Sequence, residues 1–241
     1  MNRKFFLKHG ITALGAVFVI PLVNSCKKED TMLSATESST GSSTTKSEGC
    51  TVTPTETEGP FPTKSPSSYV RSDIRDDRDG YDLSITINIG KVSNNCAALS
   101  GVIVDIWHCD KSGNYSEYGG TQMQSTNYSS VHFLRGRQVT DSNGQVKFTS
   151  IFPGWYQGRA THIHVHIFDA SGNSLKITQI AFPEGTGSAL LAVNGYSKGM
   201  TGYTYNAQDD VFKDDTAGVQ AATVTGNTSS GFQLSIQLNV A

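Results

Sequence analysis

The segment "GRATHIHVHIF" (residues 158–168) decides the fold, because it places three histidines two residues apart in a run of β-branched and apolar residues. Alternate side chains of a β-strand point to the same face, so His162, His164 and His166 line one face of a predicted strand. Two imidazoles at this spacing can share one metal ion, and zinc, copper and iron all suit them. A polar strand face exposed to solvent is the alternative that the His162/His164 pair alone leaves open.

Other parts of the chain repeat the two-residue period typical of strands. Apolar and polar residues alternate in "YDLSITINIG" (81–90), "GQVKFTSI" (144–151) and "FQLSIQLNV" (232–240), and "SGVIVDIWHC" (100–109) places Val102, Val104 and Ile106 on one face. Turn signals separate them, namely "DKSGN" (110–114), "DSNGQ" (141–145) and "DASGN" (169–173). Residues 183–215 show little periodicity and predict loops with a short helical turn. The pattern indicates an all-β fold, and we expect a β-sandwich of two packed, mostly antiparallel sheets with long loops.

Composition indicates one globular domain preceded by extra sequence. The chain has 241 residues, 37% of them hydrophobic, and a formal net charge of −2. That length suits a single core of substantial size. The absence of a basic excess argues against nucleic acid as a partner.

The first residues resemble an export signal. A basic start precedes an apolar run over residues 11–23, too short to span a bilayer comfortably. "LVNSC" (22–26) then resembles a lipobox, in which Cys26 becomes the lipidated residue. We therefore expect a lipoprotein signal peptide over 1–25, a flexible Ser/Thr-rich tether over 26–49 and the folded β-sandwich domain over 50–241.

This reading places the domain outside the cytoplasm, on the periplasmic or cell-surface side of a membrane that holds the lipid on Cys26. An ordinary secretory peptide cleaved near Ser25 is the alternative. "NRKFFLK" (2–8) also resembles a twin-arginine export motif with lysine in the second position, so the export route stays open.

Three further cysteines, Cys50, Cys96 and Cys109, would lie in an oxidising compartment. Three is an odd number, so one thiol is free. Cys50 opens the domain and Cys96 lies in a polar loop, which predicts a disulfide between them. Cys109 follows a predicted strand and is interpreted as a small buried apolar residue.

Two tyrosines accompany the histidine pair. Tyr156 follows a Pro-Gly corner six residues before His162, and Tyr115 follows a turn after the strand "VDIW". A free phenol has a pKa near 10 and is a poor ligand, but a trivalent iron can draw off its proton. Two histidines with two tyrosines therefore describe a site suited to ferric iron. The alternative for each tyrosine is a turn residue that packs its ring and hydrogen-bonds its hydroxyl.

These residues resemble the intradiol ring-cleavage dioxygenases, the family of catechol and protocatechuate dioxygenases. The similar segments, in order across residues 50–185, are "TPTETEGPFP" (53–62), "VDIWHCDKSGNYS" (104–116), "FLRGRQVTDSNGQVKF" (133–148), "IFPGWYQGRATHIHVHIF" (151–168) and "TQIAFP" (178–183). The likeness is greatest to the secreted single-domain branch, which lacks a helical dimerisation segment. One departure is Pro62, where an aromatic hydroxyl is common near the pocket mouth.

The resemblance implies a non-haem Fe(III) site and a set of roles. The implied ligands are Tyr115, Tyr156, His162 and His164. Arg159 matches the arginine beside the substrate, and Gln179 matches a glutamine behind the ligands. His166 has no ligand role and is interpreted as structural, as are Trp107, His108 and Asp110. Tyr118 is the alternative to Tyr115 as the first tyrosine ligand, if the family motif aligns three residues later in this sequence.

The implied reaction is cleavage of a catecholic ring by O₂, between the two hydroxyl-bearing carbons, to a muconate-type dicarboxylate. Tyr156 would act as a general base and Arg159 would stabilise charge on the ring. Two alternatives remain. One is a lipid-anchored β-sandwich that binds polyphenols or glycans without catalysis. The other is a zinc or copper protein using His162, His164 and Cys109. Substrate and oligomeric state stay open.

Overall fold

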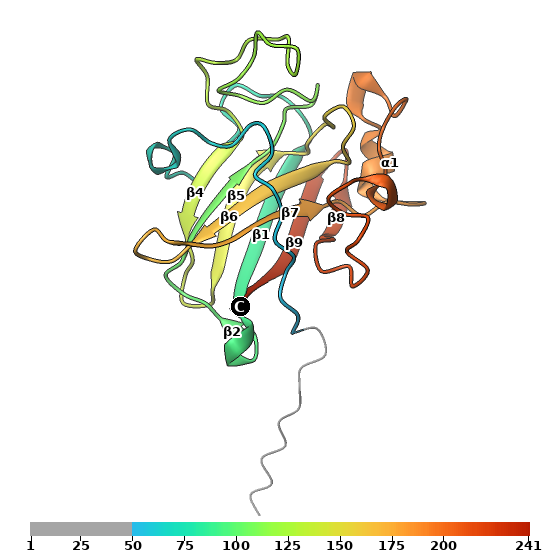
Figure 1. Ribbon diagram of the computed structural model, residues 1–241. Coiled ribbons are helices and arrows are strands. Elements are labelled where there is room, and N and C mark those ends of the chain that lie inside the picture. The colour runs from blue at the N-terminus through green and yellow to red at the C-terminus, as the bar shows by residue number, and fades with distance from the viewer. Residues whose placement is uncertain (1–49) are drawn as a thin grey trace, which may run out of the picture. The chain divides into compact units, whose positions relative to one another are not determined.

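Two β-sheets pack against each other in residues 50–241, the part of the chain that this computed structural model describes (Figure 1). One sheet contains β1 (Asp82–Lys91), β2 (Ala97–Ala98), β5 (Gln145–Ile151), β8 (Thr223–Asn227) and β9 (Gly231–Val240). The other contains β3 (Ile103–Trp107), β4 (Arg135–Val139), β6 (His162–Phe168) and β7 (Ser174–Ala181). The predicted signal peptide, Cys26 and tether lie outside the described residues.

Most strand pairs are antiparallel. The second sheet has the order β4-β3-β6-β7 and is antiparallel throughout. The first has the order β2-β1-β9-β8, with β5 also beside β1, and its one parallel pair joins β1 to β9. The expected all-β sandwich of mostly antiparallel sheets is therefore confirmed.

The core between the sheets is built from the alternating apolar residues of the strands. β1 contributes Leu83, Ile85, Ile87 and Ile89, and β9 contributes Phe232, Leu234, Ile236 and Leu238. β6 supplies Ile163, Val165 and Ile167 from its inner face. The histidines of β6 therefore lie on its outer face, away from this core.

Three aspartates build the turns that the sequence indicates. Asp110, Asp141 and Asp169 each accept, through Oδ1, hydrogen bonds from the backbone N–H groups two and four residues later. Such side-chain-to-backbone bonds close a turn without a strand ladder. The turn at Asp110 brings the chain from the end of β3 round to Tyr115.

Helical structure is short. The α-helix α1 (Ala189–Val193) is capped by the Ser188 hydroxyl, which accepts from Leu191 N at 3.3 Å. The 3₁₀ turns are Pro66–Ser68, Val92–Asn94, Tyr196–Lys198 and Asn206–Gln208. Within residues 50–241, no helix is both long and apolar enough to cross a membrane.

The loop between β3 and β4 projects from one end of the sheets (Figure 1). Residues 51–64, the crossing segment, run beside the edge strand β7, where Glu56 N donates to the Ile177 carbonyl at 2.9 Å, and then pass over the β6 histidines at Gly59. This crossing segment is held by side chains of both strands. Glu58 accepts from His166 at 2.9 Å, the Thr57 carbonyl accepts from Gln179 at 2.9 Å, and the Thr55 hydroxyl accepts from Lys176 at 2.9 Å. These three hydrogen bonds hold the crossing segment against the sheet.

Cys50 and Cys96, the pair expected from the sequence, are joined by a disulfide with a Cα–Cα distance of 5.6 Å. Cys109 is a buried free thiol. It packs with Phe61, Trp107 and Tyr115.

Candidate active site

Three side-chain donor atoms converge on the outer face of β6. His162 Nε2 lies 3.0 Å from His164 Nε2, and Tyr115 Oη lies 3.0 Å from the first and 3.4 Å from the second. All three side chains are buried, with exposures of 1–3%. Two ligands at right angles, each about 2.1 Å from one ion, would be about 3 Å apart, so this spacing fits shared coordination.

Backbone register and packing place these groups. His164 pairs with Trp107 on β3 and with Gln179 on β7, so the three side chains share one face. The Trp107 ring stacks on His164 at 4.9 Å between centroids and 1° between planes. Tyr115 is fixed through its backbone by the buried amide of Gln124, which accepts from Tyr115 N at 2.6 Å and donates to Tyr115 O at 2.8 Å.

Hydrogen bonding and burial prepare His162 as a ligand. Its Nδ1 lies 2.6 Å from the Ala160 carbonyl oxygen, which can only accept, so we assign the proton to Nδ1 and the lone pair to Nε2. Burial, reinforced by the charge of Arg159, lowers the pKa of His162 to about 3. Burial also lowers the pKa of His164, and the neighbouring His162 adds to the effect. Both imidazoles are therefore neutral at pH 7.

Tyr115 completes a donor set that fits a metal ion. Burial raises the pKa of its phenol, so the phenolate needs a cation beside it. Within the described residues, no three His, Cys, Asp or Glu side chains are placed to hold a metal ion. Two neutral imidazoles and a buried phenol thus form the candidate metal centre, and the chemistry of this set suits ferric iron. Cys109 is not among these donors, which argues against the zinc or copper reading.

Gly59 shapes the space next to the donors. Its φ is +69°, and a Cβ built there would lie 3.2 Å from His164 Cε1 and 3.8 Å from Nε2. Any other residue would crowd the His164 ring. The crossing segment can approach the candidate metal centre this closely because it carries glycine at this position.

A cavity of about 140 Å³ adjoins the three donor atoms. Its lining residues are Pro60, Phe61, Tyr115, Tyr156, Gln157, Arg159, His162 and His164. The Phe61 ring stacks on Tyr115 at 4.8 Å and meets Tyr156 edge-on at 5.3 Å. The cavity therefore has aromatic walls. The candidate metal centre lies on one side of it, and one arginine, Arg159, is part of its lining.

Tyr156, the fourth ligand implied by the sequence, lines this cavity but does not join the three donors. Its hydroxyl donates to the Met123 carbonyl at 2.7 Å. Tyr118 does not join the three donors either, because its hydroxyl donates to the Pro62 carbonyl at 2.7 Å. Tyr115, and not its neighbour Tyr118, is therefore the tyrosine beside the histidines.

Arg159 and Gln179, the other predicted site residues, contact each other. Arg159 Nη2 donates to Gln179 Oε1 at 2.8 Å, and Arg159 Nε donates to Asp209 Oδ2 at 2.9 Å. Asp209 was missed by the sequence reasoning. It lies among other aspartates in an aperiodic stretch, so no local pattern distinguishes it.

The remaining histidines of the two motifs are structural. His166 bridges Glu58 and the Ser174 hydroxyl, at 2.9 and 2.8 Å, and so fastens the crossing segment to the sheet. His108 is buried between the Cys109 carbonyl and the Ser150 hydroxyl, at 2.8 and 2.7 Å.

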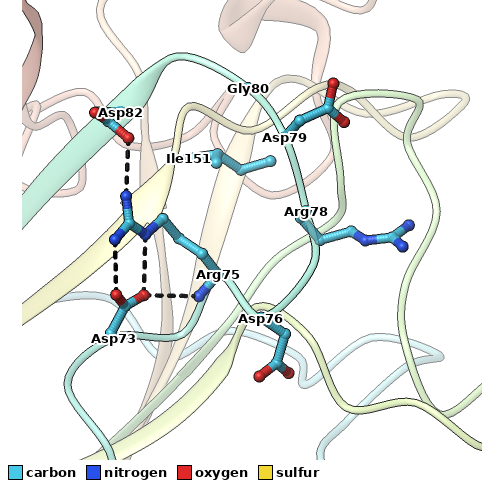
Figure 2. Close-up of a pocket in the computed structure, with 8 residues that line it drawn as sticks. All are labelled: Asp73, Arg75, Asp76, Arg78, Asp79, Gly80, Asp82 and Ile151. Atoms are coloured by element: carbon cyan, nitrogen blue, oxygen red, sulfur yellow. Dashed lines mark hydrogen bonds and ion pairs between the residues drawn. The ribbon is translucent and has the colours of Figure 1, made fainter.

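A larger depression of about 470 Å³ lies away from these residues (Figure 2). It is lined by Asp73, Arg75, Asp76, Arg78, Asp79, Gly80, Asp82 and Ile151. Figure 2 shows Arg75 between Asp73 and Asp82, and it pairs with them at 2.8 and 3.1 Å. The other charged residues of the depression pair with residues outside its lining, namely Asp76 with Arg71, Arg78 with Asp77, and Asp79 with Lys111. Charges paired at a surface are typical of solvated structure, so we place the candidate active site at the smaller cavity.

Comparison with known proteins identifies the family of this chain. The sequence model of a dioxygenase family matches residues 58–194, more than half of the chain. The chain belongs to the intradiol ring-cleavage dioxygenases. These enzymes are oxidoreductases, and the matched region contains all of the predicted site residues from Tyr115 to Gln179.

This dioxygenase is similar to an intradiol ring-cleavage dioxygenase from Tetranychus urticae. The two are 31% identical with a TM-score of 0.68, over 79% of this chain and 95% of the other. The dioxygenase domain of a carbohydrate-binding fusion protein from Streptomyces sp. SirexAA-E shares the fold, at 24% identity and a TM-score of 0.56, over 78% of this chain and 97% of the other.

A curated relative is the chlorocatechol 1,2-dioxygenase of Rhodococcus opacus. It is 28% identical over 128 residues, which are 45% of this chain. The match spans 46% of that enzyme, about half of its length.

Proposed function

We propose that this protein uses non-haem Fe(III) to cleave a catecholic ring with O₂ between its two hydroxyl-bearing carbons, giving a muconate-type dicarboxylate. The observation that carries the proposal is the convergence of Tyr115 Oη, His162 Nε2 and His164 Nε2 within 3.0–3.4 Å of one another. Family membership supplies the reaction class, and these three residues would hold the iron.

The cavity supports a single aromatic ring as substrate. Its volume of about 140 Å³ is close to the roughly 150 Å³ that holds one benzene molecule in an engineered protein cavity. Pro60 and Phe61 offer apolar contacts to such a ring. Because Tyr115, His162 and His164 also line this cavity, a ring bound in it would lie next to the residues that would hold the iron.

Ferric iron, when bound, supplies a Lewis acid that draws electron density from a catecholate and so makes a ring carbon reactive toward O₂. Both oxygen atoms of O₂ enter the product, and the ring bond between the oxygenated carbons breaks.

The chain's own residues bind the ring, orient it and handle its protons. Arg159 lines the cavity and presents a fixed positive charge to the electron-rich ring. We keep Tyr156 as the proposed fourth ligand and as the group that holds a proton released by the substrate. When Tyr156 is protonated, its hydroxyl can donate a hydrogen bond to the Met123 carbonyl, which lies 2.7 Å away.

Product analysis tests this proposal. Iron-loaded protein is incubated with catechol and isotopically labelled O₂, and the products are identified by mass spectrometry. We expect a muconate-type dicarboxylate that carries both labelled oxygen atoms. Binding of catechol without any ring-opened product would instead favour a non-catalytic polyphenol-binding module.

We also propose that the domain is exported and anchored to a membrane through lipid on Cys26. The Cys50–Cys96 disulfide supports an oxidising compartment. Metabolic labelling with a radioactive fatty acid tests the anchor. We expect label in the wild type and none in Cys26→Ser, whereas an unlabelled wild type would contradict the anchor.

A further inference from the structure

Arg159 is the only arginine or lysine that lines the cavity in the described part of the chain. Two of its three nitrogens are engaged. Nε donates to Asp209, at 2.9 Å to Oδ2 and 3.2 Å to Oδ1, and Nη2 donates to Gln179 Oε1 at 2.8 Å. A guanidinium is planar, so fixing two nitrogens fixes the direction of the third.

Asp209 ties this guanidinium to the backbone next to it. The carboxylate is fully buried, and it also accepts from Ala160 N at 2.6 Å and from Val211 N at 2.9 Å. Burial alone would raise the pKa of Asp209, but the hydrogen bonds from Arg159 and from these N–H groups outweigh it and lower the pKa. Asp209 is therefore a carboxylate at neutral pH.

A neighbouring residue of the same segment packs on the arginine. The guanidinium carbon of Arg159 lies 5.8 Å from the centre of the Phe212 ring, within the range of a cation–π contact. Asp209 and Phe212 both lie beyond residue 194, where the family match ends. Residues C-terminal to the matched region thus contact and orient Arg159, which lies within the matched region.

A free arginine side chain samples many rotamers, and ordering it on substrate binding would cost conformational entropy. A charge that is already oriented avoids that cost and stabilises developing negative charge better. We infer that Asp209 is a positioning residue that holds the Arg159 guanidinium in the cavity wall, oriented toward the bound catecholic ring. This inference rests on the proposed function, in which Arg159 lies beside the substrate.

The competing reading is that Asp209 only caps the backbone at Ala160 and Val211. A double-mutant cycle separates the two readings, because a residue that acts through Arg159 loses its effect once Arg159 is replaced. Asp209→Asn keeps the size and one acceptor oxygen but removes the charge. Asp210→Asn is the matched control, since Asp210 is 89% exposed, pairs with Lys213 and makes no contact with Arg159.

We expect Asp209→Asn to lower kcat/KM by about 10- to 100-fold, the size of effect seen when the hydrogen-bond partner of a metal ligand is removed. In the Arg159→Gln background the same change should lower it less than twofold, and Asp210→Asn should have no effect in either background. An equal loss in both backgrounds would overturn the inference and leave Asp209 a backbone cap.

A second readout needs neither iron nor turnover, so it separates this inference from the proposed function. In ¹⁵N-labelled metal-free protein, the Nε–H signal of Arg159, assigned by its loss in Arg159→Gln, reports the order of the guanidinium. We expect an ordered signal in the wild type and in Asp210→Asn, and a mobile one in Asp209→Asn. A mobile Arg159 in the wild type would overturn the inference even if Asp209→Asn failed to fold.

Discussion

The Nε2 atoms of His162 and His164 lie 3.0 Å apart on the outer face of β6, both buried and both directed at Tyr115 Oη. Two residues on alternate positions of one strand always share a face, but their ring nitrogens meet only if their rings are turned toward each other. Here the Ala160 carbonyl turns His162 and the Trp107 ring holds His164. The pair is thus oriented before any ion binds, as expected of a preformed metal centre.

Replacing Tyr156 by phenylalanine tests whether it belongs to the iron site. If Tyr156 is the fourth ligand, Tyr156→Phe shifts the visible phenolate-to-iron absorption of the loaded protein and slows turnover by at least tenfold. Tyr118→Phe is the control, because it removes a hydroxyl that donates to Pro62 instead. An unchanged spectrum in Tyr156→Phe would reduce the ligand set to Tyr115, His162 and His164.

Gly59→Ala should impair the metal centre. The new methyl group would lie 3.2 Å from His164 Cε1, and the backbone is left-handed there with φ +69°. Gly172→Ala imposes a similar backbone cost of about 1 kcal/mol, at φ +86°, with nothing within 4 Å of the new methyl group. Both variants should lose similar stability in thermal unfolding, while only Gly59→Ala binds less iron. Equal iron content in the two would show that His164 tolerates the methyl group.

Stability should fall as the pH drops from about 6.5 to about 4, in part through His108. Burial lowers the pKa of His108 to about 4 in the folded protein, from 6.5 when unfolded. The unfolded chain therefore binds a proton in this window that the folded one does not, so acid favours unfolding, by up to about 3 kcal/mol. Denaturant unfolding of metal-free protein measures this, and His108→Gln should show a shallower pH dependence. A parallel curve for His108→Gln would exclude His108 as a source.

Removing the disulfide should destabilise the domain. Cys50 and Cys96 are 46 residues apart, and a closed loop of that length stabilises by about 4 kcal/mol in the chain-entropy account. The Cys50→Ser/Cys96→Ser variant should unfold at lower denaturant concentration. Cys109→Ser, which removes a free thiol, is the comparison. The same midpoint in the wild type and the double variant would mean that the loop is ordered without the bridge.

The sandwich could be predicted because its strands obey a strict two-residue alternation, as Leu83 to Ile89 and Phe232 to Leu238 show. His162 and His164 could be placed together for the same reason, since their relationship is local. The role of Tyr115 could be predicted only from the family motif. Tyr115 follows a turn, and the direction of a side chain there does not follow from a sequence period.

Contacts between distant segments could not be predicted. Asp209 meets Arg159 across 50 residues of chain, and nothing in the sequence near Asp209 marks it among neighbouring aspartates. Gln124 accepts a hydrogen bond from Tyr115 N, but it lies in a polar loop whose composition does not distinguish it. The direction of the Tyr156 hydroxyl, toward the Met123 carbonyl, likewise depends on the conformation of that loop.

The visible absorption spectrum of the purified domain, taken with iron analysis before and after anaerobic addition of catechol, tests the central claim most directly. The account predicts stoichiometric iron, a broad tyrosinate band that colours the protein red to brown, and a shift of this band to longer wavelength with catechol. A protein that stays colourless after ferric loading would contradict it, because Tyr115, His162 and His164 would then not hold ferric iron.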